Sequence, residues 1–404
     1  MDSVTSNDVF AQMGVSELIA PQLRNAARAA RAGDTGSAMT HAWLFSGPPG
    51  SGRSVAAVAF AAALECSNPD VVGCGQCEQC RAVRNGTHGD VVHIVPQELS
   101  IAVATMRRDV IEPAATRPTV ASWRVVILDN ADRLTDGAAN ALLKTVEEPP
   151  KHTVILLCAP STDPQDVMPT LVSRSRHVYV PQPNTKEVAR LLMQSEDVSE
   201  EIATLAAAST SNHVGRARRL VRDPDMQRSR ARTLTLAEDV FRGDKAFRNV
   251  TAMVKEITKV AEQGLAEASE AEVEKLRTAL GMGASGRGAQ KALRGSAGQI
   301  RELEDKHKKR KTRAVRDALD LALVDLAGLY RDALIKAVDS KVELMHPDFQ
   351  QLSEGLCQRV SPQGLSACIE AIMKAREHLG MNVRPETALD AMVGRIRLAC
   401  GVSE

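Results

Sequence analysis

The sequence predicts an α/β domain built on a parallel sheet, followed by a region made only of helices. Up to about residue 180, short apolar runs alternate with stretches that favour helices. Runs that are apolar throughout are typical of strands covered by helices on both faces of a parallel sheet. From about residue 226 onward no segment resembles a strand. The five expected strands are residues 42–46, 91–95, 124–129, 153–158 and 177–180.

The composition narrows the class of protein. The 404 residues are 44% hydrophobic but only 2% aromatic, so the cores are expected to consist of Ala, Leu and Val. Basic and acidic residues number 51 and 50, which excludes a global basic field for nucleic acid. The N-terminus lacks a signal-peptide pattern, and no apolar run is long enough for a membrane span. We therefore expect a cytoplasmic protein without a membrane partner.

A glycine-rich loop follows the first expected strand. Residues 47–54 read Gly-Pro-Pro-Gly-Ser-Gly-Arg-Ser, and a helix is expected directly after them over residues 55–64. This order of strand, glycine loop and helix is typical of a P-loop. Glycines such as Gly47, Gly50 and Gly52 let backbone N–H groups surround a phosphate, and the helix N-terminus adds partial positive charge.

The loop departs from the P-loop pattern at one position. Ser54 is retained, but Arg53 replaces the lysine that reaches the β- and γ-phosphates. The guanidinium keeps the charge but is a wide planar fork, so the exchange is not conservative at a close-fitting site. Several alternatives stay open: Arg53 weakens the binding of ATP and Mg²⁺, abolishes it, or leaves it intact without turnover. In the simplest case the loop is a relic that holds an anion or nothing.

The third strand ends in an acidic residue, as a nucleotide site requires. Asp129 follows the run 125–128 and is a candidate to hold Mg²⁺ through water. The next residue, Asn130, is a neutral amide that cannot accept a proton, and loss of a general base costs roughly 10²–10⁴-fold in rate. Together, Arg53 and Asn130 predict that hydrolysis is not the task of this chain.

Two arginines are candidates for contact with phosphate oxygens. Arg174 lies in Ser-Arg-Ser just before the fifth strand and is either an ordinary surface residue or an arginine finger acting in trans. Such a finger is worth roughly 10³–10⁵ in rate. Arg218, in the helical stretch 185–222, is either a contact for the γ-phosphate of its own chain or part of a charged helix face.

Four of the eight cysteines cluster within fifteen residues and predict a zinc site. Cys66, Cys74, Cys77 and Cys80 can close tetrahedrally around Zn²⁺, because each C-x-x-C turn presents two thiolates. Four protein ligands leave no position for a catalytic water, so the predicted role is structural. The remaining cysteines are isolated and are expected to be small buried hydrophobic residues: Cys158, Cys357, Cys368 and Cys400.

The C-terminal half shows helical patterns and one basic run. Apolar residues spaced by three and four predict an amphipathic helix over residues 319–334, and residues 281–286 form a flexible interruption. The basic run 306–313 is either a solvated helix face or a contact for DNA or an acidic partner. Without interleaved aromatic residues it is not expected to stack nucleotide bases.

These features in this order resemble bacterial DNA polymerase III clamp-loader subunits. Residues 140–150 read Asn-Ala-Leu-Leu-Lys-Thr-Val-Glu-Glu-Pro-Pro, similar to the family motif N-A-L-L-K-x-x-E-E-P-P. The Ser-Arg-Ser around Arg174 resembles the family's Ser-Arg-Cys, and a zinc module after the P-loop helix is also characteristic. The resemblance covers about residues 8–225. It implies a RecA-like AAA+ P-loop domain over 1–182 with the zinc module at 66–80, a helical lid over 183–225 and an all-helical collar over 226–404.

Within this family, weakened nucleotide motifs combined with a retained finger and zinc module are similar to the delta-prime type. The resemblance implies a non-catalytic subunit of the polymerase holoenzyme, in a pentamer with gamma/tau motor subunits and delta. That pentamer opens the sliding clamp and loads it onto primed DNA, with Arg174 completing a neighbour's ATP site. Two alternatives remain: an active gamma/tau-like motor ATPase that tolerates Arg53, or a regulatory protein whose zinc module contacts DNA.

Overall fold

The computed structural model describes residues 8–33, 38–96, 98, 100–280, 289–381 and 383–402. Contacts within the chain define two compact units, and each has its own core. The first unit comprises Met1–Gln194 with Asn212–Gly215, and the second comprises Ser195–Ser211 with Arg216–Glu404. The three-domain division at residues 182 and 225 stays a prediction.

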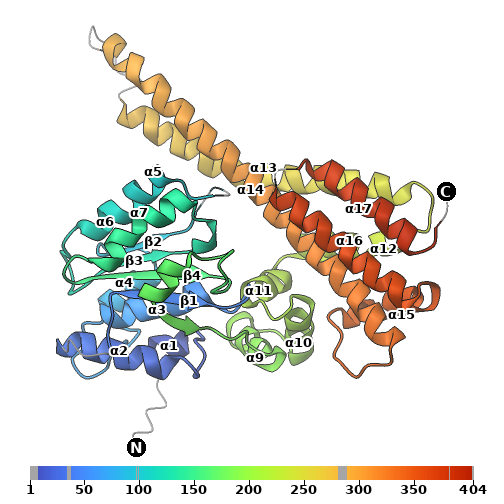
Figure 1. Ribbon diagram of the computed structural model, residues 1–404, viewed down its shortest axis with the longest axis horizontal. Helices are drawn as coiled ribbons and strands as arrows, with labels where there is room; N and C mark the ends of the chain where they lie inside the picture. Colours follow the sequence, from blue (N-terminus) through green and yellow to red (C-terminus); the bar gives the residue numbers. More distant parts are fainter. Residues whose placement is uncertain are drawn as a thin grey trace, which may run out of the picture. The chain divides into compact units, whose positions relative to one another are not determined.

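The first unit is built on a five-stranded parallel sheet (Figure 1). The strands are β1 (Ala42–Ser46), β2 (Val91–Ile94), β3 (Arg124–Leu128), β4 (Thr153–Ala159) and β5 (Arg176–Tyr179). Their order across the sheet is β2-β3-β4-β1-β5, and every neighbouring pair is parallel. All residues of β1 and β4 are buried, as the uninterrupted apolar runs predicted. The five predicted strands are confirmed.

Helices cover both faces of this sheet, because alternate side chains of a strand point to opposite sides. On one face, Trp43 and Phe45 pack with α2 (Ala20–Ala32) and α3 (Arg53–Leu64). On the other, Leu44 packs with α7 (Asp136–Glu147). The predicted α/β fold class, with a parallel sheet covered by helices, is confirmed. Its assignment as a RecA-like AAA+ domain stays a prediction.

Shorter elements complete the first unit. They are α1 (Val9–Gln12), α4 (Glu78–Arg84), α5 (Val103–Met106), a π-helix (Arg107–Ile111), α6 (Glu112–Ala115), a 3-10 helix (Ala131–Arg133), α8 (Pro169–Arg174) and most of α9 (Thr185–Glu196).

The second unit consists of helices in its described residues, as predicted. These are α10 (Glu200–Ser209), α11 (Val214–Arg222), α12 (Pro224–Asp239), α13 (Lys245–Ala279), α14 (Ala289–Ala337), a 3-10 turn (Pro347–Phe349), α15 (Gln350–Arg359), α16 (Pro362–Gly380) and α17 (Pro385–Ala399). The amphipathic stripe on α14 is confirmed, because Leu319, Leu323, Leu326 and Tyr330 are buried and Leu334 packs beside them.

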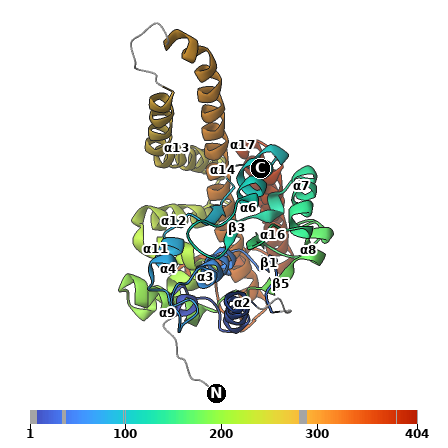
Figure 2. The same cartoon turned by 90° about the vertical axis from the view of Figure 1, so that its left-hand side faces the viewer.

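Helices α13 and α14 run side by side as a long hairpin (Figures 1 and 2). Much of the basic run on α14 forms ion pairs within this hairpin. Glu272 of α13 accepts hydrogen bonds from His307 at 2.8 Å and Arg310 at 3.0 Å, and Lys311 pairs with Glu262. These contacts are those of a paired helix face. The expected flexible interruption at 281–286 lies outside the described residues.

Within the part of the chain that the structure describes, no helix is long and apolar enough to cross a membrane.

Candidate functional site: a glycine loop and a cysteine cluster

The glycine loop between β1 and α3 has a backbone that other residues cannot adopt easily. Gly50 and Gly52 both have φ 87°, in the left-handed region, and Gly52 caps the N-terminus of α3. A Cβ atom on Gly50 would lie 2.7 Å from the ring of His213, and one on Gly47 would lie 2.2 Å from the carbonyl oxygen of Val180. The predicted loop is therefore formed, and its glycines are required by close approach.

Two side chains in this loop are left without partners. Ser51 is only 8% exposed, and its hydroxyl makes no hydrogen bond within the described structure. That hydroxyl lies inside the loop, 2.8 Å from the position a Cβ on Gly47 would take. The Nη1 atom of Arg53 is likewise buried and unpaired. Since buried donors are normally satisfied, the loop fits an anion such as a phosphate group.

Asp129, at the end of β3, is by contrast fully engaged. Ser54 donates a hydrogen bond to its Oδ1 at 2.5 Å, and the Nε2 atom of His93 lies 2.8 Å from its Oδ2. Burial alone would raise the pKa of Asp129, but the hydrogen bonds from His93 and Ser54 outweigh burial and hold this pKa below its ordinary value. The carboxylate is thus ionised, yet both oxygens already have partners. This arrangement fits a magnesium ion poorly.

His93 was not found from the sequence. It stands on the edge strand β2, in a run read only as a strand, and its neighbours give no sign of its partner. The register could have found it: His93 pairs with Ile127, two residues before Asp129 on the adjacent parallel strand. Side chains two apart on a strand share a face, so the two groups meet.

Asn130 follows Asp129 in the left-handed region, with φ 51° and ψ 52°. Asparagine tolerates this conformation better than most residues. It caps the 3-10 helix Ala131–Arg133. The nearest acid beyond it is Asp132, which is half-buried, and burial raises the pKa of its carboxyl. Asp132 is a second residue that the sequence reasoning passed over.

Arg174 ends α8 and is exposed at the surface. Its Nε lies 2.5 Å from Oε1 of Glu147, the last residue of α7, and the two side chains are 41% and 45% exposed. An exposed ion pair contributes about 0–1 kcal/mol, so another anion can replace Glu147 at little cost. This geometry supports an available guanidinium, whereas its action in trans stays a prediction.

Arg218, on α11, contacts an acid of its own unit. Its Nε lies 2.9 Å from Oε1 of Glu196, which also pairs with Arg222. Such pairing is what a charged helix face would show. A contact with a γ-phosphate stays a prediction.

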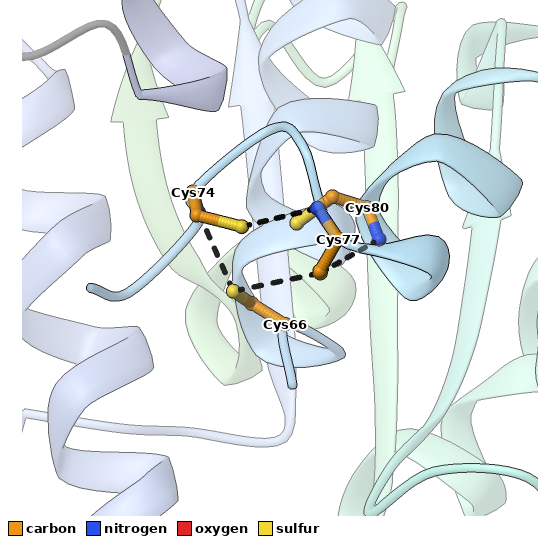
Figure 3. Close-up of side chains that lie close together, drawn as sticks. All are labelled: Cys66, Cys74, Cys77 and Cys80. Atoms are coloured by element: carbon orange, nitrogen blue, oxygen red, sulfur yellow. Dashed lines mark hydrogen bonds between the residues drawn. The ribbon is translucent and has the colours of Figure 1, made fainter. Parts of the chain in front are cut away.

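The four clustered cysteines converge between α3 and α4 (Figure 3). Their sulfur atoms all lie within 4.8 Å of one another. Backbone N–H groups of Cys74, Cys77 and Cys80 each donate to the sulfur of a preceding cysteine at 3.3–3.4 Å. The tight turns depend on left-handed Gly73, where a Cβ would lie 2.9 Å from Val9. The cluster can hold a metal ion.

The thiols of this cluster influence one another strongly. A hydrogen bond from Cys80 lowers the pKa of Cys66 to about 4, and the same bond raises the pKa of Cys80. Closely packed thiolates require a neutralising cation, and four sulfur ligands suit Zn²⁺. Of the other four cysteines, Cys158 and Cys368 are buried as expected, whereas Cys357 and Cys400 are only half-buried. The expectation that all four are isolated is wrong for two of them, because the sulfur atoms of Cys368 and Cys400 lie 3.7 Å apart.

The residues that match a known family lie within the first unit. Residues 26–184 match the family described as "DNA polymerase III, delta subunit". The chain is 38% identical over 136 residues to "DNA polymerase III subunit tau" of Bacillus subtilis (strain 168), covering 33% of this chain and 23% of that protein. It is 32% identical over 200 residues to "DNA polymerase III subunit delta'" of the same organism, covering 50% of this chain and 59% of that protein.

A third relative is "DNA polymerase III subunit delta'" of Escherichia coli (strain K12), with 30% identity over 207 residues, 50% of this chain and 61% of that protein. The chain thus spans less than two thirds of the length of each of these relatives. Among solved structures, a gamma subunit-related protein from Thermotoga maritima has 17% identity and a TM-score of 0.43, covering 94% of this chain and 99% of that one.

Proposed function

We propose that the chain works as a delta-prime-type subunit of a DNA polymerase III clamp loader, because residues 26–184 match the family described as "DNA polymerase III, delta subunit" and the chain is similar to two delta' proteins. In this role it joins gamma/tau motor subunits and delta in a pentamer that loads the sliding clamp onto primed DNA in replication. Its own site does not hydrolyse ATP, and Arg174 completes the site of a neighbour. The delta-prime relatives align with half of this chain, whereas the tau relative aligns with a third.

The main support for this proposal is the identity of the residues that follow β3. Hydrolysis needs a carboxylate beside Asp129 to activate water, and this position holds Asn130 in a conformation that suits an amide. A chain without a base can still assist hydrolysis if it presents a cation to another chain's phosphates. The exposed guanidinium of Arg174 meets that requirement.

The decisive experiment replaces Arg174 in the reconstituted loader. Arg174→Ala is expected to lower clamp-dependent ATP hydrolysis at the completed site by roughly 10³–10⁵-fold, the range found for arginine fingers. Arg174→Lys should recover little activity, because an ammonium lacks the planar fork. Arg28→Ala, another exposed arginine of the first unit, is the matched control. Unchanged hydrolysis and clamp loading with Arg174→Ala would refute the finger.

Measuring ATP turnover by the isolated chain distinguishes the delta-prime role from that of an active motor ATPase. A delta-prime-type subunit alone should release no phosphate above background, whereas a motor subunit should turn over ATP. The double variant Arg53→Lys, Asn130→Glu restores both groups that hydrolysis lacks. Motor-like turnover by the unaltered chain would exclude the delta-prime assignment.

We also propose that the cysteine cluster holds one structural Zn²⁺. Protein purified without chelators should contain about one zinc per chain, and removal should unfold the segment between α3 and α4. Cys74→Ser should lose the metal, whereas Cys357→Ser, which changes a half-buried cysteine outside the cluster, should keep it. Metal analysis that finds no zinc in native protein would contradict the site. Binding of DNA by the isolated chain that disappears in Cys74→Ser would favour the regulatory alternative instead.

A further inference from the structure

We propose that the glycine loop binds the phosphates of a nucleoside di- or triphosphate without magnesium, with Arg53 supplying the positive charge and His93 blocking the metal position. This inference rests on the proposed function, because it names the ligand state of the site that does not hydrolyse ATP. It departs from what a P-loop with Ser54 and Asp129 would lead one to expect.

The donor side of the site is open. Ser51 Oγ and Arg53 Nη1 are buried and lack partners, although both are strong hydrogen-bond donors. They flank the N-terminus of α3, a twelve-residue helix whose first turn adds about half a positive charge. A buried donor that makes no hydrogen bond costs about 1–3 kcal/mol, and a charged donor costs more. Two such donors in one loop therefore indicate that an acceptor binds there. A phosphate oxygen is the acceptor that suits a guanidinium fork.

The carboxylate that would bind magnesium, in contrast, already has partners at both oxygens. Magnesium in such a site is held by the serine hydroxyl and, through water, by the aspartate. Here Asp129 already accepts from Ser54 at one oxygen and from His93 at the other. The side chain of Asp129 is 11% exposed, so little room remains for a water that would link it to a metal. His93 therefore acts as a positioning residue that keeps the carboxylate away from a cation.

The test measures nucleotide affinity of the full chain by calorimetry, with ATP or ADP in either excess EDTA or Mg²⁺. Our expectation is that affinity in EDTA equals or exceeds affinity in Mg²⁺. A conventional P-loop would instead gain about tenfold or more from Mg²⁺, or about 1.4 kcal/mol. Binding that appears only with Mg²⁺, or no binding in either condition, would overturn the proposal.

Variants separate the two halves of the argument. His93→Thr keeps a β-favouring residue but frees Oδ2 of Asp129, so Mg²⁺ should now raise affinity by about tenfold. His93→Gln still presents an N–H donor and should behave like the unaltered chain. His152→Asn is the matched control, since His152 is exposed and its ring packs on Trp123 rather than on the loop. If His93→Thr stays insensitive to Mg²⁺, the blocking role is wrong.

Arg53 is tested in the same way. Arg53→Met should abolish binding in EDTA because it removes the positive charge, whereas Arg53→Lys, which keeps the charge and introduces the usual P-loop residue, should still bind. Far-UV circular dichroism confirms that each variant is folded. The outcome is independent of Arg174: metal-free binding can fail while the finger functions in the loader, and the finger can fail while the loop binds nucleotide.

Discussion

Two partly buried arginines, one in each unit, differ in how many partners they have within the chain. Arg53 in the glycine loop has a buried Nη1 without any partner. Arg230 on α12, only 9% exposed, donates to both oxygens of Asp348, to Ser209 and to His346 at 2.6–3.0 Å, and only its Nε is buried without a partner. A charge whose partners come from the same chain stabilises the fold, whereas a charge left open points to a ligand. The state of pairing, rather than the count of charges, separates these roles.

The α13–α14 hairpin extends this comparison to the basic run. By sequence the run was either a solvated helix face or a contact for DNA or an acidic partner. In the structure, Glu272 pairs with two of its members and Glu262 with a third. The run therefore resembles Arg230 more than Arg53, although its pairs are more exposed.

The largest effect should come from breaking the pairing of Arg230. Arg230→Met removes the hydrogen bonds to Asp348, Ser209 and His346, and we expect a loss of about 3 kcal/mol or more in the free energy of unfolding of the second unit, because hydrogen bonds to charged groups contribute about 1.5–3 kcal/mol each. Arg232→Met is the matched control, because Arg232 is 63% exposed and pairs with exposed Glu256, so it should cost under about 1 kcal/mol.

Arg53→Met sharpens the same comparison and should change stability little. Urea unfolding followed by circular dichroism reports the helices of both units. Tryptophan emission reports the first unit alone, because Trp43 and Trp123 are the only tryptophans and both lie there. Equal losses for Arg230→Met and Arg53→Met would break the distinction between paired and open charges.

An effect nearly as large is expected from pH. His346 is buried, and burial lowers its pKa from 6.5 to about 4. Between these values the unfolded chain binds a proton that the native chain does not, so stability falls as the pH drops from about 6.5 to 4. At about 1.4 kcal/mol per pH unit, the loss reaches about 3 kcal/mol. In His346→Gln the stability should depend less on pH by this amount; identical profiles would contradict the assignment.

The smallest effect should come from the hairpin. Hydrogen bonds from Arg310 and His307 lower the pKa of Glu272, which adds stability above the ordinary carboxyl pKa and loses it as the pH falls. This side chain is 39% exposed, so Glu272→Gln should cost under about 1 kcal/mol, and less at high salt. The freed cations should increase retention on immobilised duplex DNA. Glu304→Gln, an exposed glutamate of α14, should change neither quantity.

The sequence predicted the strands to within about one residue, because buried parallel strands are contiguous apolar runs. The helix after the glycine loop begins at Arg53 rather than Val55, since left-handed Gly52 already caps it. The cysteine cluster was predictable because its ligands are neighbours along the chain. His93 was not, because its bond to Asp129 crosses two strands.

Other ion pairs between residues distant in sequence could not be predicted either, for the same reason as the pair of His93 and Asp129. Arg230 and Asp348 are separated by 118 residues, and no local pattern marks either one. The residues near the basic run of α14 also do not reveal that it forms ion pairs with Glu272 of α13. A site whose residues lie in one short segment could be predicted from the sequence. A site whose residues come together only by packing required the structure.

One helix links the two sites of the first unit. α3 begins at the glycine loop with Arg53 and ends at Leu64, two residues before Cys66, so its twelve residues span about 18 Å between the proposed anion site and the proposed metal site. Oxidative damage to the sulfurs would loosen the far end of this rod and misalign the amide dipoles at its near end. Loss of phosphate binding would then be an early consequence of cysteine oxidation and would precede unfolding of the sheet.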